Sequence, residues 1–526
     1  MPPSASKPAP RFGFLSLSHQ HTALSATIFL TAFALLSRVI GLIRDKYIAY
    51  TFGAGPGTDA YNVAFVLPDL INYLLVGGAA SISFVTILSR YKEAGKQEEG
   101  DRALSVILNT MLVVLGAAIL LAEIFAPLFG RFYFPDNPSE AALCTTLTRI
   151  ILPGPIFFFS GGVLASVALV RKQFGYQAMG SLLYNVFIIL GGVLLSRTLG
   201  IPSLAIGVLA GTIGGPFLVN AYAARKAGVR YQPVLDFKNQ GLRDWVVMSL
   251  PLMLGVTVVF MDSNILSWFA KHTAGDITRL LNAKKLFTAP MAIVGQAAGA
   301  ASFPFFASLY NRGMFEDYAA AVNRSVSRIL SASLLLSSAM FALALPMVDL
   351  IFRGGKYTRT DTASTAIYFA VFSISLALWS AQSIYSRAFF AAGETRAPML
   401  AGTLITAISL PVYWFLHQHF GSLGLAWASN IAILIQTLTL AVLAHRRYLV
   451  PLFGLDRADI AKTAAAALVS GVGLRLLSPV IPHGLSRTGD LAVLIAGGLI
   501  WAALCFATLR LTRATFLDEI LRRLHR

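Results

Sequence analysis

Charged side chains are scarce in this chain. Only 13% of its 526 residues are Asp, Glu, Lys or Arg, whereas a soluble protein carries about 25%. Hydrophobic residues make up 56%, and the mean hydropathy is +0.69. This balance excludes a water-soluble enzyme and indicates a protein that lies in a lipid bilayer.

Cysteine and long polar loops are also nearly absent. The two cysteines, Cys144 and Cys505, lie far apart in or beside apolar runs, which argues against a disulfide framework or a cysteine metal cluster. The longest polar stretches, near 90–102 and 225–244, are too short for the catalytic loop of a membrane glycosyltransferase. We therefore expect no enzyme activity, no metal and no cofactor.

Acidic residues are fewer than basic ones, 24 against 42, so the formal net charge is +18. Signals for membrane topology and contacts with anionic lipid headgroups explain this excess, so nucleic acid is not an expected partner. The first residues lack the apolar core and cleavage site of a secretory signal, so the first membrane helix should be retained.

Long apolar runs between polar breaks predict an all-α polytopic membrane protein with about fourteen transmembrane helices. The predicted helices lie near 22–49, 59–89, 104–130, 143–170, 177–196, 202–224, 243–270, 279–308, 325–352, 363–391, 397–417, 421–445, 459–478 and 488–510.

An internal repeat divides these helices. The second helix carries Pro68 and then Gly78-Ala79-Ala80-Ser81, and the eighth carries Pro290 and then Gly299-Ala300-Ala301-Ser302, about 221 positions later. A second pair of matches, which ends in Ala178-Met179 and Pro398-Met399, has nearly the same offset. Six helices in each half predict two lobes related by a parallel repeat.

The predicted divisions follow from this repeat and from the basic loops. They are a cytoplasmic amino-terminal tail (1–21), an N-lobe (22–224), a cytoplasmic linker (225–242), a C-lobe (243–447), and two extra helices with a cytoplasmic tail (448–526). Lys and Arg are concentrated on the side of the membrane that holds the amino terminus, which predicts both termini in the cytoplasm.

Several ionic side chains fall at membrane depth, where each costs about 2.5–3.5 kcal/mol on insertion scales. Arg38, Arg44 and Asp45 lie in the first helix. Repeats of this kind enclose a central site where the halves meet, and we expect a cationic cavity there. Arg can make two parallel hydrogen bonds to a phosphate, so the predicted ligand is anionic. The full set of predicted substrate-binding residues is Arg38, Arg44, Asp45, Asp59, Lys285 and Arg387.

These charges also have a structural interpretation. Arg38, Arg44, Asp45 and Asp59 could form an ion network that holds helices together without a ligand, because buried charges usually pair. Asp262 is a weak candidate for a proton or sodium site, and an acceptor satisfied by its neighbours is an equal alternative.

The same residues carry a resemblance to a known family. The segments Ser37-Arg38-Val39-Ile40-Gly41-Leu42-Ile43-Arg44-Asp45, Phe52-Gly53-Ala54-Gly55, Thr58-Asp59-Ala60-Tyr61 and Leu67-Pro68-Asp69-Leu70 resemble the amino-terminal signature of the MurJ/MviN family. Tyr385–Pro398 resembles the stretch before the family's eleventh helix. The resemblance implies a fourteen-helix member of the multidrug/oligosaccharidyl-lipid/polysaccharide flippase superfamily in the bacterial inner membrane. Its implied substrate is lipid II, the polyprenyl-pyrophosphate precursor of peptidoglycan.

The chain departs from the family pattern at several positions. Asn72 and Gly77 stand where the family usually has an Arg and a Glu, and Lys284 and Lys285 replace its usual Asp-Arg pair. Of the sodium-binding groups in some members, only Asp262 matches. These departures leave open a paralogue that handles a different polyprenyl-linked sugar.

The sequence therefore predicts a flippase that moves lipid II to the outer leaflet by alternating access. Arg38, Arg44 and Lys285 would hold the pyrophosphate, while Asp45 and Asp59 would position these cations. Membrane lipids and cell-wall synthesis proteins are the expected further partners. The alternatives are a flippase for another lipid-linked oligosaccharide, a drug or cation antiporter of the same fold, which predicts an anionic cavity, and a non-transporting scaffold, which predicts dispensable cavity charges.

Overall fold

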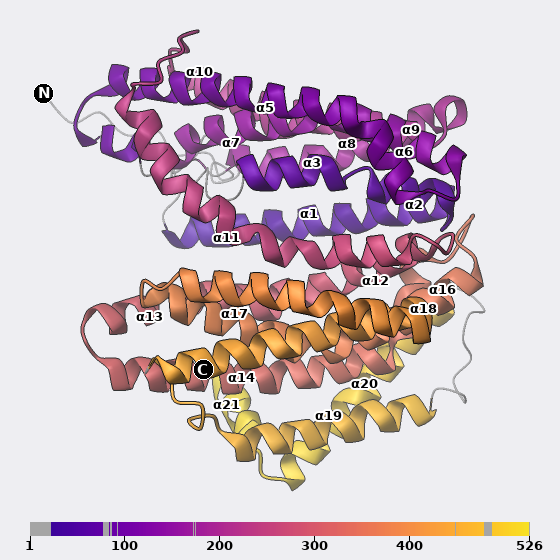
Figure 1. Cartoon of the computed structure of the whole chain (residues 1–526). Coiled ribbons are helices and arrows are strands. Elements are labelled where there is room, and N and C mark those ends of the chain that lie inside the picture. Colours follow the sequence, from indigo (N-terminus) through magenta and orange to yellow (C-terminus); the bar gives the residue numbers. More distant parts are fainter. Residues whose placement is uncertain are drawn as a thin grey trace, which may run out of the picture. The chain divides into compact units, whose positions relative to one another are not determined.

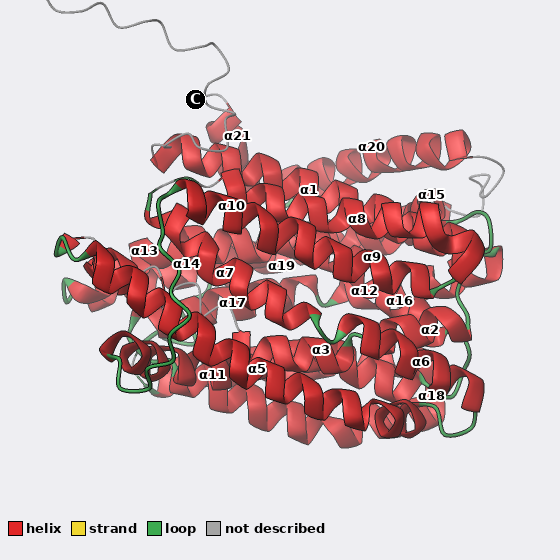
Figure 2. Ribbon diagram, turned by 90° about the horizontal axis from the view of Figure 1, so that it is seen from above, coloured by secondary structure: helices red, strands yellow, loops and turns green. Residues whose placement is uncertain are grey.

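The computed structural model describes residues 23–524 except 77–83, 85, 86, 92, 172, 174, 448 and 478–486. Every regular element among these residues is a helix, and none is a strand; Figure 2 shows only helices and loops. The predicted all-α class is therefore confirmed. The predicted tail 1–21, Gly77 and the repeat segment Gly78–Ser81 lie outside the described residues.

The first half of the chain forms helices that we name in chain order. They are α1 (Ala23–Phe52), α2 (Pro56–Val63), α3 (Val66–Ile71), η2 (Asn72–Val76), α5 (Gln97–Tyr133), α6 (Pro138–Ile151), α7 (Gly154–Val170), α8 (Gly175–Leu199), α9 (Pro202–Thr212), η3 (Ile213–Phe217), α10 (Leu218–Lys226) and α11 (Gln240–Ala270).

The second half continues in the same way (Figure 1). Its helices are α12 (Asp276–Met291), η4 (Ala292–Gln296), α13 (Ala297–Asn311), α14 (Phe315–Ala342), α15 (Ala344–Phe352), α16 (Arg359–Ile374), α17 (Leu376–Ala391), α18 (Arg396–Arg446), α19 (Arg457–Leu477), α20 (Arg487–Leu511) and α21 (Thr515–Leu524).

These helices agree with about fourteen membrane spans. By length and composition alone, eight helical stretches among the described residues are apolar enough to cross a membrane, and the pair α16–α17, bent by 44°, makes nine. The 51-residue α18 contains both predicted helices 397–417 and 421–445. They count as two helices because the backbone of α18 breaks at Gly421, where φ is 55° and ψ is −142°. The short α21 was not predicted.

Proline places a similar distortion in two helices. A π-helical turn, η2, begins at Asn72 after Pro68, and another, η4, begins at Ala292 after Pro290. In both helices the π turn thus follows a proline by two to four residues. The two π turns begin 220 positions apart (292 − 72), close to the offset of the sequence repeat.

The packing divides the chain into two compact units. Unit 1 comprises the chain up to Ile48 and Ala60–Thr257, and unit 2 comprises Ala49–Asp59 and the chain from Val258 onward. The three boundaries fall inside α1, α2 and α11. The loop after α1 therefore belongs to unit 2, and the predicted linker 225–242 lies wholly within unit 1.

Unit 1 is built from closely packed helices. α8 packs along α9, and α5 packs against α6 and α7. Small residues permit this contact, because a Cβ on Gly191 of α8 would lie 2.7 Å from the Cα of Gly207 of α9. Close backbone approach at glycine is the usual device of membrane helices.

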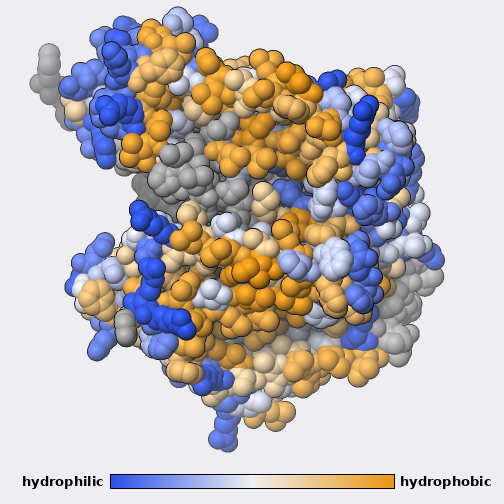
Figure 3. All heavy atoms as spheres, in the orientation of Figure 1, coloured by the Kyte–Doolittle hydropathy of each residue, from blue (hydrophilic) through white to orange (hydrophobic). Residues whose placement is uncertain are grey.

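Unit 2 packs α14 against α17 and α19, α12 against α16, and α19 against α20. Its core includes the fully buried side chains of Phe306, Tyr318 and Phe389. On the face shown in Figure 3, hydrophilic residues gather at the helix ends of each unit, and hydrophobic residues cover the flanks between them. A bilayer-spanning protein distributes its surface in this way.

Candidate substrate-binding site

Arg44 and Asp45 form a compact ion pair on α1 in unit 1. The Nη2 and Nε groups of Arg44 donate to Asp45 Oδ1 at 2.9 and 3.2 Å. Its Nη1 donates to Asn185 Oδ1 of α8 at 2.9 Å. The side chains are 21% and 8% exposed, respectively. A guanidinium carries five N–H groups, so these bonds use three and leave two, and the structure gives those two no partner among its described residues.

Arg38 lies two turns before Asp45 on the same helix. Its side chain is exposed, and the structure shows no ion pair for it within the described part of the chain. Unit 1 thus brings together Arg44 and Asp45 of the predicted set, and Arg38 lies on the same helix with an uncompensated charge.

Asp59 is bound to the start of α12 in unit 2. Its Oδ2 accepts a hydrogen bond from the backbone N–H of Gly275 at 2.5 Å, and its Oδ1 accepts from the N–H and the hydroxyl of Thr278 at 2.8 and 2.6 Å. A carboxylate is stabilised at a helix amino terminus, where free N–H groups concentrate positive charge. Within unit 2 these bonds make Asp59 an anchor that joins α2 to α12, and none of them is to a cation.

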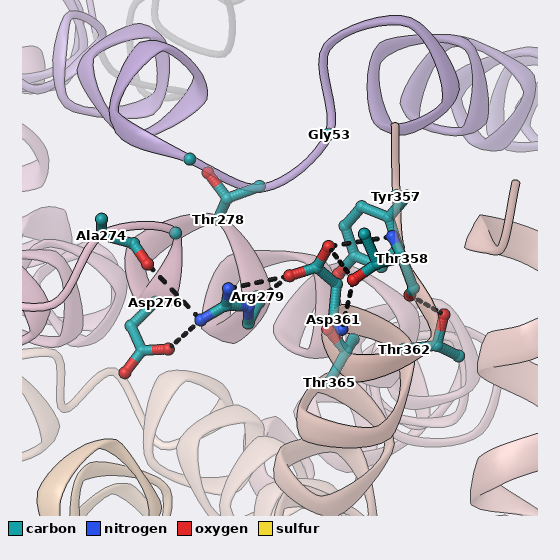
Figure 4. Close-up of polar contacts among 12 residues, drawn as sticks. Gly53, Ala274, Asp276, Thr278, Arg279, Tyr357, Thr358, Asp361, Thr362 and Thr365 are labelled. Atoms are coloured by element: carbon teal, nitrogen blue, oxygen red, sulfur yellow. Dashed lines mark hydrogen bonds and ion pairs between the residues drawn. The ribbon is translucent and has the colours of Figure 1, made fainter. Parts of the chain in front are cut away.

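A second partly buried arginine, which the sequence analysis missed, lies beside this anchor. Arg279 of α12 donates to Asp276 through Nη1 at 2.7 Å and to Asp361 through Nε at 2.8 Å. Figure 4 shows its guanidinium between the two carboxylates. Asp361 also caps α16, because Thr358 and Asp361 form a reciprocal capping box. Arg279 therefore ties α12 to α16, and its place at a predicted helix end gave no sign of this pairing.

The loop before α16 completes this region. Tyr357 is 1% exposed, and its hydroxyl lies 2.5 Å from the hydroxyl of Thr365. Burial, the largest effect, raises the pKa of Tyr357 to about 12, so the phenol stays neutral at physiological pH. The residues in Figure 4 thus form a hydrogen-bonded network in unit 2.

Asp262 of α11 is paired with a lysine inside unit 2. Lys284 Nζ lies 2.6 Å from Asp262 Oδ2, and Tyr413 and Ser429 donate hydrogen bonds to the two carboxylate oxygens at 2.5 and 3.1 Å. The Lys284 ammonium also lies 4.7 to 5.4 Å from three aromatic ring centroids, those of Phe372, Trp379 and Phe287. A tethered cation thus already neutralises the carboxylate that the sequence offered as a weak ion site.

A small cavity of about 30 Å³ adjoins this pair. Asp262, Thr406, Ser409 and Gln436 are among its lining residues. Among the described residues no cluster of three His, Cys, Asp or Glu side chains could hold a metal ion.

Lys285 and Arg387 also lie in unit 2. Lys285 of α12 is partly exposed, next to the buried Lys284. Arg387 of α17 is partly exposed as well, and its Cγ would lie 3.5 Å from a Cβ on Gly299 of α13. Glycine at 299 therefore allows α13 to pass close to the Arg387 stem.

On the second predicted helix the chain departs from the family pattern at Asn72 and Gly77, and of these two Asn72 lies among the described residues. Asn72 begins the π turn η2, and its side-chain oxygen is buried with no hydrogen-bond partner among the described residues.

Comparison with known proteins places these residues in a family context. A family model described as "Lipid II flippase MurJ" matches residues 48–486. A probable lipid II flippase MurJ of Buchnera aphidicola subsp. Acyrthosiphon pisum (strain APS) is 26% identical over 441 residues, which cover 82% of this chain and 85% of the relative.

Two solved structures share the fold. Lipid II flippase MurJ in an inward closed conformation aligns with a TM-score of 0.75 and 21% identity, over 92% of this chain and 99% of that one. An inward-facing multidrug resistance MATE family transporter of the MOP superfamily aligns with a TM-score of 0.63 and 15% identity, over 82% and 96%. At these identities the likeness shows a common helical fold, which confirms the predicted architecture.

Proposed function

Because the chain belongs to the lipid II flippase MurJ family, we propose that it moves lipid II from the cytoplasmic to the outer leaflet of the bacterial inner membrane. The family match over residues 48–486 carries this proposal, since it extends across both units. Transport is by alternating access, and no covalent bond is made or broken.

Arg44 is proposed to grip the pyrophosphate. Its two remaining N–H groups can donate to phosphate oxygens while Asp45 and Asn185 hold the guanidinium in place. Charge-assisted hydrogen bonds of this kind are about twice as strong as neutral ones. In this proposal Asp45 positions the cation, and its two hydrogen bonds with Arg44 support that role.

Arg38, Lys285 and Arg387 are proposed to add positive charge for the diphosphate. All three side chains are accessible or partly accessible, so a ligand can reach them. Asp59 receives a different proposed role from the one first expected, because its hydrogen bonds to Gly275 and Thr278 suit an anchor between α2 and α12.

The topology and lobe divisions belong to the same proposal. Both termini face the cytoplasm, the lobes comprise 22–224 and 243–447, and the linker 225–242 is cytoplasmic. The basic residues in the polar connections support this orientation. Cell-wall synthesis proteins are the proposed protein partners, because the precursor is made on one side of the membrane and used on the other.

The MATE-like fold alone does not favour drug or cation antiport. Such transport requires an available carboxylate, and Asp262 is already neutralised by Lys284 at 2.6 Å. The accessible charges on α1 and α17 are cationic, which suits an anionic cargo.

Depletion of the protein in its host tests the proposal. Lipid II should accumulate and the wall should weaken, and reintroducing the wild-type gene should reverse both effects. A normal lipid II pool together with loss of a capsule or another surface glycan would refute lipid II as the cargo and support the paralogue.

A further inference from the structure

The connection between α10 and α11 runs as an extended strap, residues 229–239, along the start of α5 in unit 1. Three side chains on α5, each four residues apart, bind its backbone. Asp101 Oδ2 accepts from the N–H of Arg230 at 3.1 Å, and Ser105 Oγ accepts from the N–H of Gln232 at 3.0 Å. Asn109 Nδ2 donates to the carbonyls of Gln232 and Val234 at 2.9 and 3.0 Å.

The hydrogen bonds from Asp101, Ser105 and Asn109, which we call the ladder, hold one face of the strap against α5. Spacing of four residues aligns the three polar side chains on one side of α5, so the strap is held along its length. Tyr231 adds a further bond, its hydroxyl donating to Asn109 Oδ1 at 2.7 Å. Several backbone groups that would otherwise need water are therefore satisfied by the helix.

The opposite face of the strap is apolar and exposed. Side chains alternate along an extended segment, and Tyr231, Pro233, Leu235 and Phe237 are all exposed, although the Tyr231 hydroxyl turns back to Asn109 on α5 and Phe237 begins a turn. Phe237, the most exposed of the large ones, is 68% accessible. Three large apolar side chains within seven residues form a surface that favours leaving water.

The neighbouring helices place this surface at the edge of the hydrocarbon region. Asn109 precedes Val113, the first large apolar side chain that α5 exposes among its described residues, by one turn, or about 6 Å. α10 exposes Tyr222 shortly before the strap, and α11 exposes Val247 shortly after it. The lipid-facing surfaces of three helices thus begin beside the strap.

The strap and its two ends carry an excess of positive charge, although carboxylates lie beside it: Glu98 of α5 is 3.9 Å from Arg230, and Asp244 follows Arg243. The stretch 225–243 contains one acidic residue, Asp236, and five basic ones, Arg225, Lys226, Arg230, Lys238 and Arg243. Basic residues beside a membrane helix are attracted to anionic headgroups. Basic residues also lie on both sides of the apolar side chains, with Arg230 before Tyr231 and Lys238 after Phe237.

We propose that the strap is a lipid-binding surface that inserts Tyr231, Leu235 and Phe237 among the headgroups and upper acyl chains of an anionic leaflet. Extended backbone is tolerated at this depth only where its polar groups are hydrogen-bonded, and the ladder on α5 supplies those bonds. The strap fixes unit 1 in the membrane plane, whatever cargo the protein carries.

Spin labels test the depth of the strap. The full chain, with Cys144→Ala and Cys505→Ala, carries a label at Leu235→Cys or Phe237→Cys in nanodiscs that contain phosphatidylglycerol. Leu128→Cys on the exposed apolar flank of α5 and Lys238→Cys beside Phe237 are the matched lipid and water controls. The measured quantity is the ratio of label accessibility to oxygen and to a water-soluble nickel chelate.

The ratio at both strap sites should resemble that at Leu128 and exceed that at Lys238 severalfold. It should fall towards the Lys238 value in Asn109→Ala, which loses the bonds to the strap, and stay high in Tyr231→Phe. Ratios equal to that at Lys238 in the parent chain would overturn the proposal. Protection seen only in native membranes would overturn it too, in favour of a protein partner. Equal ratios in phosphatidylcholine and phosphatidylglycerol would refute the role of anionic headgroups.

Discussion

The Arg44 guanidinium gives three of its five N–H groups to Asp45 and Asn185, and it remains partly exposed. Residues that serve structure alone usually satisfy all their polar groups when buried. An arginine fixed in place with donors to spare is suited to bind an anion. Arg44 is therefore the residue at which the proposed transport site can be tested against an ion network that only holds helices together.

Replacing Arg44 tests this distinction. Arg44→Ala should abolish complementation while the protein still accumulates, and Arg44→Lys should be intermediate, because it keeps the charge but loses bidentate hydrogen bonds. The loss corresponds to about 1.5–3 kcal/mol per hydrogen bond to a charged group. Complementation and membrane abundance are measured together on each variant.

The control adds Asp45→Asn to Arg44→Ala. If Arg44 only neutralises Asp45, the single variant should accumulate poorly and the double variant should recover, since the uncompensated carboxylate is gone. A well-expressed and fully active Arg44→Ala protein would contradict both roles.

Lys284 and Asp262 differ from Arg44 because the lysine is more enclosed and both oxygens of its carboxylate partner accept hydrogen bonds. Lys284→Met should lower the apparent melting temperature in detergent, because breaking a buried pair costs about 3–5 kcal/mol. Adding Asp262→Asn should restore most of the loss. An unchanged melting temperature for the single variant would show that the pair does not stabilise unit 2.

Sequence reasoning found the ionic residues but not their partners. Arg44 and Asp45 are adjacent on one helix, but neighbours on a helix point about 100° apart, so the structure was needed to show that they pair. The pairing of Asp262 with Lys284, and of Arg279 with Asp361, depends on which helices touch, which spacing along one helix cannot give. The partners of Asp59 were missed for the same reason, since its hydrogen-bond donors Gly275 and Thr278 lie more than 200 positions away.

At the scale of whole elements, apolar length was a good guide because a span must cover the bilayer. The predicted helix 177–196 appears as Gly175–Leu199, and 202–224 appears as the stretch Pro202–Lys226. The amphipathic α21 was missed because its ten residues are too few and too polar to register as a span. Proline signalled bends, but not the π turns that follow Pro68 and Pro290.

The break in α18 depends on one glycine. Gly421 has a φ of 55°, and a Cβ there would have no heavy atom within 4 Å. Gly421→Ala should therefore destabilise the protein through backbone strain alone, by about 1–3 kcal/mol.

The matched control is Gly116→Ala in α5, which also has open space around its Cβ but lies inside a regular helix, where alanine is favoured by about 0.8–1 kcal/mol. Thermal unfolding in detergent should move down for the first variant and not for the second. Equal melting temperatures would show that the chain bends freely at Gly421.

At the scale of the whole molecule, transport of lipid II to the outer leaflet requires a definite orientation of the protein in the membrane. The basic connections predict both termini in the cytoplasm. A reporter enzyme that is active only outside the cytoplasm, fused after Arg526, should be silent, and the same reporter fused in the loop at Lys356 should be active. A bright carboxyl-terminal fusion would invert the proposed topology and with it the direction of transport.

The most direct test of the central claim is the leaflet in which lipid II resides. Cells depleted of the protein are treated with an external hydrolase that cleaves lipid-linked pyrophosphate and cannot cross the membrane. We predict that the cleaved fraction of lipid II falls to background, recovers with the wild-type protein and stays low with Arg44→Ala. A cleaved fraction that is unchanged by depletion, in a host with no second copy of the gene, would contradict the account.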